Sequence, residues 1–111
     1  MYNKEIAIVF DTIADLLSIQ GANTFRVRAY RQAARIVEGE SEEFRKKVER
    51  GDDLTEISGI GEDLSAKIEE MVETGECQFL EDLQEDVPLD LQKMLSMEDI
   101  GPKRVQQLYE E

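Results

Sequence analysis

The chain has 111 residues, of which 26 are acidic and 13 are basic, and its formal net charge is −13. A chain of this length can bury only one modest core, which predicts one small domain or a domain with a short extension. With one cysteine and no histidine, an internal disulfide, the common zinc-ligand sets and a histidine-activated nucleophile are excluded. Any catalysis would have to use Lys, Tyr, Asp or Glu.

The hydropathy pattern is typical of a helical protein. Acidic residues alternate with Leu, Ile, Val and Ala at helical spacing, which indicates solvated helix faces rather than disorder. No apolar run approaches the ~20 residues that span a bilayer, and the first residues lack the features of a secretory signal. We therefore expect an all-α protein that forms a compact helical bundle. It should be cytoplasmic and monomeric, and it should have no membrane partner.

The net charge conceals an uneven distribution. Residues 21–37 contain no acid and four arginines (Arg26, Arg28, Arg31 and Arg35), so this stretch carries a charge of +4 and the remainder −17. Because salt screens charges beyond about 8 to 10 Å, a ligand on this surface responds mainly to the local charge. An anionic partner is therefore not excluded, although the net charge should slow its association.

The first half of the chain predicts three helices. Asn3 is a suitable cap for the first helix and Gly21 follows its end, whereas Asn23 or Thr24 starts the second. Ser41 is expected to cap a short third helix. In the second helix the apolar residues Val27, Tyr30, Ala34 and Val37 lie opposite Arg28, Arg31 and Arg35, and Arg26 lies at its start. The third helix carries a second basic cluster of Arg45, Lys46, Lys47 and Arg50.

The second half predicts a helix-hairpin-helix pattern. One turn of helix at residues 54–57 leads through a hairpin at residues 58–61 into a helix over residues 62–74 that ends at Gly75. A short acidic helix is expected over residues 76–86, and another after Pro88. A weaker second hairpin over residues 98–101 precedes Lys103 and Arg104. We place a domain boundary between residues 75 and 76, so that residues 1–75 form the domain and residues 76–111 begin a second segment.

The hairpin has the features of a phosphate-binding turn. Gly59 and Gly61 remove Cβ atoms at a tight bend, and Gly61 precedes a helix whose free N–H groups and dipole favour an anion. Short glycine motifs also occur as plain turns between helices, and this alternative stays open. Glu62 and Asp63 in the first helical turn would compete with a phosphate for the same N–H groups.

Lys67 is the candidate for covalent chemistry, because its position at the edge of the apolar stripe would partly desolvate its amine. A Schiff-base lysine must be neutral near pH 7, so its pKa of ~10.4 would have to fall by about 3 units. Pairing with Asp63, four residues earlier, opposes that shift, and an ordinary paired lysine is the favoured interpretation. Tyr30 is better explained as a core residue, and Cys77 as a small semi-buried one.

The order of motifs closely resembles the amino-terminal region of family X DNA polymerases, particularly the bacterial and archaeal ones. The resemblance covers nearly the whole chain, and its most specific part is the string from Phe25 to Ala34. The matching stretches are residues 3–6, 13–17, 25–34, 57–61, 67–68 and 74–75.

This resemblance implies an all-helical domain of the polymerase β amino-terminal, SAM-like type that binds the 5′-phosphate side of a DNA gap. The following segment would begin a subdomain that holds duplex DNA through the second hairpin. Polymerase chemistry would lie in a later palm domain outside these residues. Lys67 stands where relatives with 5′-deoxyribose-phosphate lyase activity have their Schiff-base lysine, and Arg26 where a phosphate-binding basic residue is found; Tyr30 and Arg31 belong to the neighbouring string.

The sequence departs from the family pattern at three positions. Asp63 occupies a place that is basic in lyase-competent relatives, and Ala66 replaces the acidic neighbour of the lysine. Asp99 replaces the first glycine of the second hairpin. These changes count against lyase activity and against DNA or a monovalent cation at the second hairpin.

The resulting hypothesis is a non-sequence-specific DNA-binding module of a family X polymerase, acting on gapped or nicked DNA in repair. The alternatives are a 5′-deoxyribose-phosphate lyase through Lys67 and an acidic protein-interaction module. No metal is expected, and no cofactor other than a monovalent cation at a hairpin. The residues expected to contact DNA are Arg26, Arg28, Arg31, Arg35, Gly59, Ile60, Gly61, Lys67, Gly101, Lys103 and Arg104.

Overall fold

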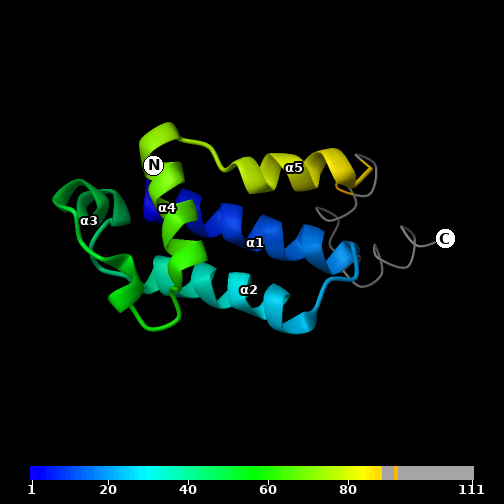
Figure 1. Cartoon of the computed structure of the whole chain (residues 1–111), viewed down its shortest axis with the longest axis horizontal. Helices are drawn as coiled ribbons and strands as arrows, with labels where there is room; N and C mark the ends of the chain where they lie inside the picture. Colours follow the sequence, from blue (N-terminus) through cyan, green and yellow to red (C-terminus); the bar gives the residue numbers. More distant parts are fainter. Residues whose placement is uncertain (89–91, 93–111) are drawn as a thin grey trace.

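A computed structural model describes residues 1–88 and residue 92, and every structural statement below concerns these residues. Gly101, Lys103, Arg104 and the second hairpin lie outside them. The described part contains five α-helices, one 3₁₀ turn and no strand (Figure 1), which confirms the predicted all-α class. In chain order these are α1 (Asn3–Ile19), α2 (Thr24–Gly39), α3 (Phe44–Arg50), η1 (Leu54–Glu56), α4 (Glu62–Thr74) and α5 (Gln78–Asp86).

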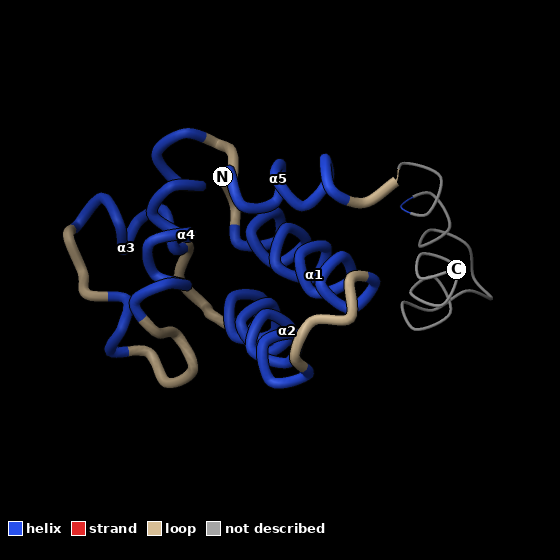
Figure 2. Tube along the Cα trace, turned by 45° about the vertical axis from the view of Figure 1, so that its right-hand side comes forward, coloured by secondary structure: helices blue, strands red, loops and turns tan. Residues whose placement is uncertain are grey.

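Helix α1 is the centre of the fold. Both α2 and α5 pack against it, on different sides, whereas α4 runs at a steep angle to all three (Figures 1 and 2). The buried face predicted from the spacing of Ile6, Phe10, Ile13 and Leu17 is confirmed, since each side chain is at most 2% exposed. No helix within the described residues is long and apolar enough to cross a membrane.

Helix α2 is capped by Asn23, one of the two residues that its sequence offers. The side chain of Asn23 accepts a hydrogen bond of 2.8 Å from the backbone N–H of Phe25, which satisfies one free donor of the first turn. Tyr30, Ala34 and Val37 are buried. The predicted apolar face is therefore correct, and it rests on α1.

The predicted cap of α3 is wrong. The helix begins at Phe44, and the buried side chain of Asn3 accepts a hydrogen bond of 2.7 Å from the Phe44 N–H, while its amide donates to the Glu42 carbonyl at 3.0 Å. Asn3 is correspondingly the first residue of α1 rather than its cap. The fold brings the starts of α1 and α3 together, so one side chain caps a helix 41 residues away.

The helix-hairpin-helix segment matches its prediction closely. The η1 turn covers residues 54–56, and α4 covers residues 62–74 and ends at Gly75, whose φ of 77° suits glycine. Helix α5 then returns along α1, where Leu83 and Val87 join the core together with the preceding Cys77. The described part of the second predicted segment thus packs against the first, and the boundary at residues 75 and 76 stays a prediction.

Replacement of Asn3 by alanine should lower the free energy of unfolding by about 2 kcal/mol, because it removes the cap of α3 and leaves a part-buried carbonyl without its donor. Asn23→Ala removes an exposed cap and should cost about 1 kcal/mol. Urea denaturation of both variants measures the difference. Equal losses would contradict the role of Asn3 as a tether between two helices.

Candidate nucleic-acid interface

The hairpin over residues 57–61 is anchored from within and exposed at its bend. Ile60 is 3% exposed, and its N–H donates to the Ile57 carbonyl at 3.0 Å. Ser58, Gly59 and Gly61 are exposed. No side chain of the described part caps α4, which leaves N–H groups of its first turn available to an external anion.

The two glycines serve different purposes. Gly59 has a φ of +93°, and a Cβ atom there would overlap the Ile36 side chain of α2, so the bend is pressed against that helix. Gly61 has a φ of −87°, and a Cβ atom at that position would meet nothing within 4 Å. The expectation that the bend requires glycine for steric reasons is therefore correct for Gly59 and wrong for Gly61.

Lys67 lies in a niche between three helices. Its ammonium nitrogen is 2.7 Å from Asp63 Oδ1 and 4.9 Å from the ring centroid of Phe79 on α5. The Tyr30 hydroxyl on α2 donates to Asp63 Oδ2 at 3.5 Å. The Lys67 side chain is only 14% exposed, so both the partial burial and the pairing with Asp63 are confirmed.

The electrostatics of the niche keep Lys67 charged. Burial lowers the pKa of Lys67, but the hydrogen bond to Asp63, the charge of Asp63 and the interactions with Tyr30 outweigh burial and raise it above its ordinary value. Burial likewise raises the pKa of the Tyr30 phenol. An ammonium at neutral pH is the wrong state for a Schiff-base nucleophile.

Phe79 connects the niche to a second cation. The guanidinium carbon of Arg26 lies 5.2 Å from the Phe79 centroid, within range of a cation–π contact. Phe79 also stacks on Tyr30, with centroids 6.0 Å apart and ring planes 20° apart. Sequence reasoning did not select Phe79, because its partners lie on α2 and α4 and are remote in the sequence.

The four arginines do not form one free face. The guanidinium of Arg31 pairs with Asp11, at 3.4 Å, and with Asp15, and so links α2 to α1. The sequence places Arg31 with Arg28 and Arg35 on one side of the helix, but two α1 carboxylates hold the Arg31 guanidinium, and its contact with DNA stays a prediction. Arg28 and Arg35 are exposed and form no ion pair with another described residue.

An exposed aromatic residue precedes these arginines. Phe25 is 76% exposed, which makes it the most exposed of the large hydrophobic side chains in the described part. Sequence reasoning did not select it as a site residue. A signal was present, because at 100° per residue Phe25 lies about 140° from Tyr30 and hence off the buried face of α2.

Two members of the second basic cluster, Lys47 and Arg50 on α3, are already paired with acids. Arg50 pairs with Glu42 at 2.7 Å and with Asp52 at 2.5 Å, and Lys47 lies 3.6 Å from Glu42. These contacts lower the pKa values of the Glu42 and Asp52 carboxyl groups, chiefly through their hydrogen bonds with Arg50. Lys47 and Arg50 therefore have little capacity left for an anion.

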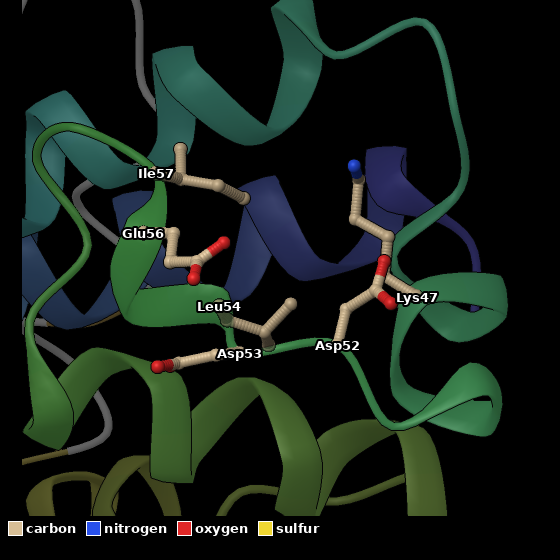
Figure 3. Close-up of a pocket in the computed structure, with 6 residues that line it drawn as sticks. All are labelled: Lys47, Asp52, Asp53, Leu54, Glu56 and Ile57. Carbon is tan, nitrogen blue, oxygen red and sulfur yellow. The ribbon is translucent and has the colours of Figure 1, made fainter.

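A cavity of about 190 Å³ adjoins this cluster (Figure 3). Three of its lining side chains are acidic, which makes it unsuitable for a phosphate. Among the described residues, no group of three or more histidine, cysteine or acidic side chains is arranged to hold a metal ion. The lining residues are Lys47, Asp52, Asp53, Leu54, Glu56 and Ile57.

An all-α fold with an exposed glycine bend at the amino end of a helix defines a helix-hairpin-helix protein. The sequence profile of the family described as "Helix-hairpin-helix domain" matches residues 1–77, more than half of the chain. The chain belongs to this family.

The chain is also similar to a longer polymerase. Over 111 residues, its whole length, it is 33% identical to the DNA polymerase/3′-5′ exonuclease PolX of Bacillus subtilis (strain 168). It covers 19% of that protein, so it spans about a fifth of the length of this curated relative. The similarity lies in the amino-terminal portion of the relative, which confirms the resemblance to the amino-terminal region of family X DNA polymerases.

Alanine at position 59 should lower the free energy of unfolding by about 2 kcal/mol, because an L-residue disfavours the left-handed region and the new methyl group overlaps Ile36. The matched change Gly61→Ala has space and an ordinary φ and should cost less than about 1 kcal/mol. Thermal unfolding of the two variants makes the comparison. A larger loss of stability for Gly61→Ala than for Gly59→Ala would contradict the assignment of Gly59 as the glycine that the bend requires.

The pKa of Lys67 should fall in Asp63→Asn, because burial would then act without the opposing carboxylate. NMR titration of the Lys67 side-chain resonances measures the change. Glu69→Gln, an exposed α4 variant with the same change of charge, is the control and should leave this pKa unaltered. An unchanged pKa in Asp63→Asn would refute the assignment of Asp63 as the dominant partner.

The stability of the wild-type chain should decrease at alkaline pH. The folded state holds the Tyr30 and Lys67 protons above their ordinary pKa values of 10.0 and 10.5, at which the unfolded chain releases them. The stability that the folded state gains from these two raised pKa values is therefore complete below pH 10.0. It is lost as the pH rises through the pKa values of the folded state. Urea midpoints measured across this range test the sign, and a stability that rises with pH would contradict it.

Proposed function

We propose that this chain is a non-sequence-specific DNA-binding module of a family X DNA polymerase, and that it engages gapped or nicked DNA near a 5′-phosphate during repair synthesis. The observation that carries the proposal is the exposed hairpin at the uncapped start of α4. The family match and the similarity to PolX support it. We also propose that residues 1–75 form the binding domain and that residues 76–111 begin the next part of the polymerase.

The hairpin supplies backbone contacts that do not depend on sequence. A phosphate at the start of α4 would accept hydrogen bonds from main-chain N–H groups and gain from the helix dipole, which contributes only about 0.3 to 1 kcal/mol at an exposed site. All nucleotides carry the same phosphate, so such contacts position DNA without reading bases. The hairpin alone therefore predicts weak binding.

The exposed arginines of α2 extend this surface. Ile36, which contacts the bend, and Phe25, at the start of α2, are 11 positions apart, or about 16 Å along the helix axis. That distance corresponds to about five nucleotide steps of one strand of B-DNA. Arg28 and Arg35 lie between these points on the solvent side, which suits contacts to several phosphates of one strand.

Phe25 favours a gap over an intact duplex. An exposed aromatic ring offers a face on which an unpaired base can stack, and such stacking contributes about 1 to 3 kcal/mol per base. Bases inside a continuous duplex are already stacked on their neighbours. The exposed ring beside Arg28 therefore suits the unpaired template bases of a gap.

The lyase alternative is weaker in this structure. It requires a neutral Lys67, whereas Asp63 pairs with the amine and raises its pKa. Phe79 also lies against the amine, at 4.9 Å. We therefore assign Lys67 to binding and packing, and we expect borohydride to trap no covalent adduct with an abasic 5′ end.

Fluorescence anisotropy should detect binding of the chain to gapped DNA, more tightly with a 5′-phosphate than with a 5′-hydroxyl. Contacts to two to four phosphates predict a slope of log K against log salt of about −2 to −4. Arg28→Ala and Arg35→Ala should each reduce the slope by about 0.9. Phe25→Ala should weaken binding to gapped DNA more than to intact duplex.

Arg50→Ala is the matched control, because Arg50 is an exposed arginine that is already paired with Glu42 and Asp52. It should leave both affinity and salt slope unchanged. Absence of any salt-sensitive binding to gapped DNA would refute the proposal and favour a protein-interaction module.

A further inference from the structure

Lys67 and Arg26, two of the cations expected to contact DNA, both lie against one aromatic side chain of α5. Phe79 of α5 lies 4.9 Å from the Lys67 amine and 5.2 Å from the Arg26 guanidinium carbon. Together with Asp63 it leaves only 14% of the Lys67 side chain exposed. A phosphate approaching Lys67 therefore meets an aromatic ring and a carboxylate first.

Helix α5 is held in this position by contacts at both ends. The backbone N–H of Gln78 donates to Glu70 Oε2 of α4 at 2.9 Å. At the other end, Leu83 and Val87 are buried in the core, 5% and 2% exposed. These contacts fix the orientation of Phe79, so that its ring stacks on Tyr30.

The charge of α5 opposes a phosphate as well. The helix contains four acidic residues and no basic one, and all four are exposed. Like charges repel a phosphate that approaches over this helix, with a range of about 8 to 10 Å at physiological salt. The helix that carries Phe79 therefore also carries the charges that repel a phosphate. The four residues are Glu81, Asp82, Glu85 and Asp86.

We propose that α5 is an autoinhibitory cover, and that its Phe79 must leave Lys67 before this lysine can contact a DNA phosphate. The inference rests on the proposed function, because it concerns the same DNA-binding surface. Helix α5 has nine residues, and a helix of that length is marginal on its own, so its docking depends on the contacts described above. With the cover closed, the chain would bind DNA without Lys67, and opening of the cover would add the Lys67 contact to a phosphate.

The first measurement does not involve DNA. Acetylation of Lys67 by a soluble reagent, followed by mass spectrometry, reports the accessibility of its amine. Phe79→Ala and Phe79→Leu should both accelerate this modification severalfold relative to the wild-type chain. Phe79→Leu keeps most of the apolar volume, so it separates removal of the aromatic face from undocking of α5, and circular dichroism verifies that each variant is folded.

The second measurement is affinity for 5′-phosphorylated gapped DNA. Phe79→Leu should tighten binding by about 5-fold to 30-fold, the range expected when two cation–π contacts are released. The salt slope should steepen by about 0.9 as Lys67 joins the interface. In the double variant with Lys67→Ala the gain should largely disappear, because the uncovered residue is absent.

A charge variant tests the repulsive part of the cover. Glu81→Gln with Glu85→Gln should tighten binding, whereas the matched pair Glu49→Gln with Glu73→Gln, exposed acids of α3 and of the end of α4, should have a smaller effect for the same net charge. Equal effects would show that the net charge matters and that the position of α5 does not.

The outcomes separate the two proposals. If the wild-type chain binds DNA and the Phe79 variants bind no more tightly, the cover is refuted and the proposed function stands. If no variant binds DNA, the proposed function fails and the autoinhibitory role of α5 fails with it, even where Lys67 modification is faster. An unchanged modification rate in both Phe79 variants refutes the cover directly.

Discussion

Tyr30 is the junction on which this structure depends. Its ring lies 5.9 Å from Phe10 of α1 and 6.0 Å from Phe79 of α5, and its hydroxyl reaches Asp63 of α4. Four helices therefore meet at one side chain of α2. Because the ring is 3% exposed, a change in the position of any of these helices would leave apolar surface or a polar group without its partner. The position of Lys67 follows from this packing.

Local charge, rather than net charge, decides what the surface can bind. The chain carries −13 overall, but its basic residues have separate roles. Arg31 and Arg50 are held by carboxylates, Lys67 is paired and covered, and Arg28 and Arg35 are exposed on the outer side of α2. The DNA surface that we propose is therefore narrow and consists of a backbone bend, one helix side and one aromatic ring. Such a surface suits a module that contributes positioning while the rest of a longer protein contributes affinity.

The same packing that builds the fold limits the chemistry at Lys67. A buried amine without a counter-charge has a lowered pKa and can act as a nucleophile, whereas one beside a carboxylate stays protonated. Because Asp63 pairs with Lys67, the Lys67 amine is of the second kind and stays protonated. The exposed carboxylate and the buried amine lie four residues apart on α4, so their pairing follows directly from helix geometry.

The sequence by itself determined the helices, the bounds of α4 and the pairing of Lys67 with Asp63, and it limited the start of α2 to Asn23 or Thr24. All of these depend on neighbours within about one helical turn. The tertiary structure alone decided that Asn3 caps α3, that Arg31 faces α1 and that Phe79 covers Lys67. Each of these contacts joins two helices, and the order of helices along the chain does not show how they are oriented relative to one another. Periodicity shows which face of a helix is buried, but the residues that cover it depend on the packing of the whole core.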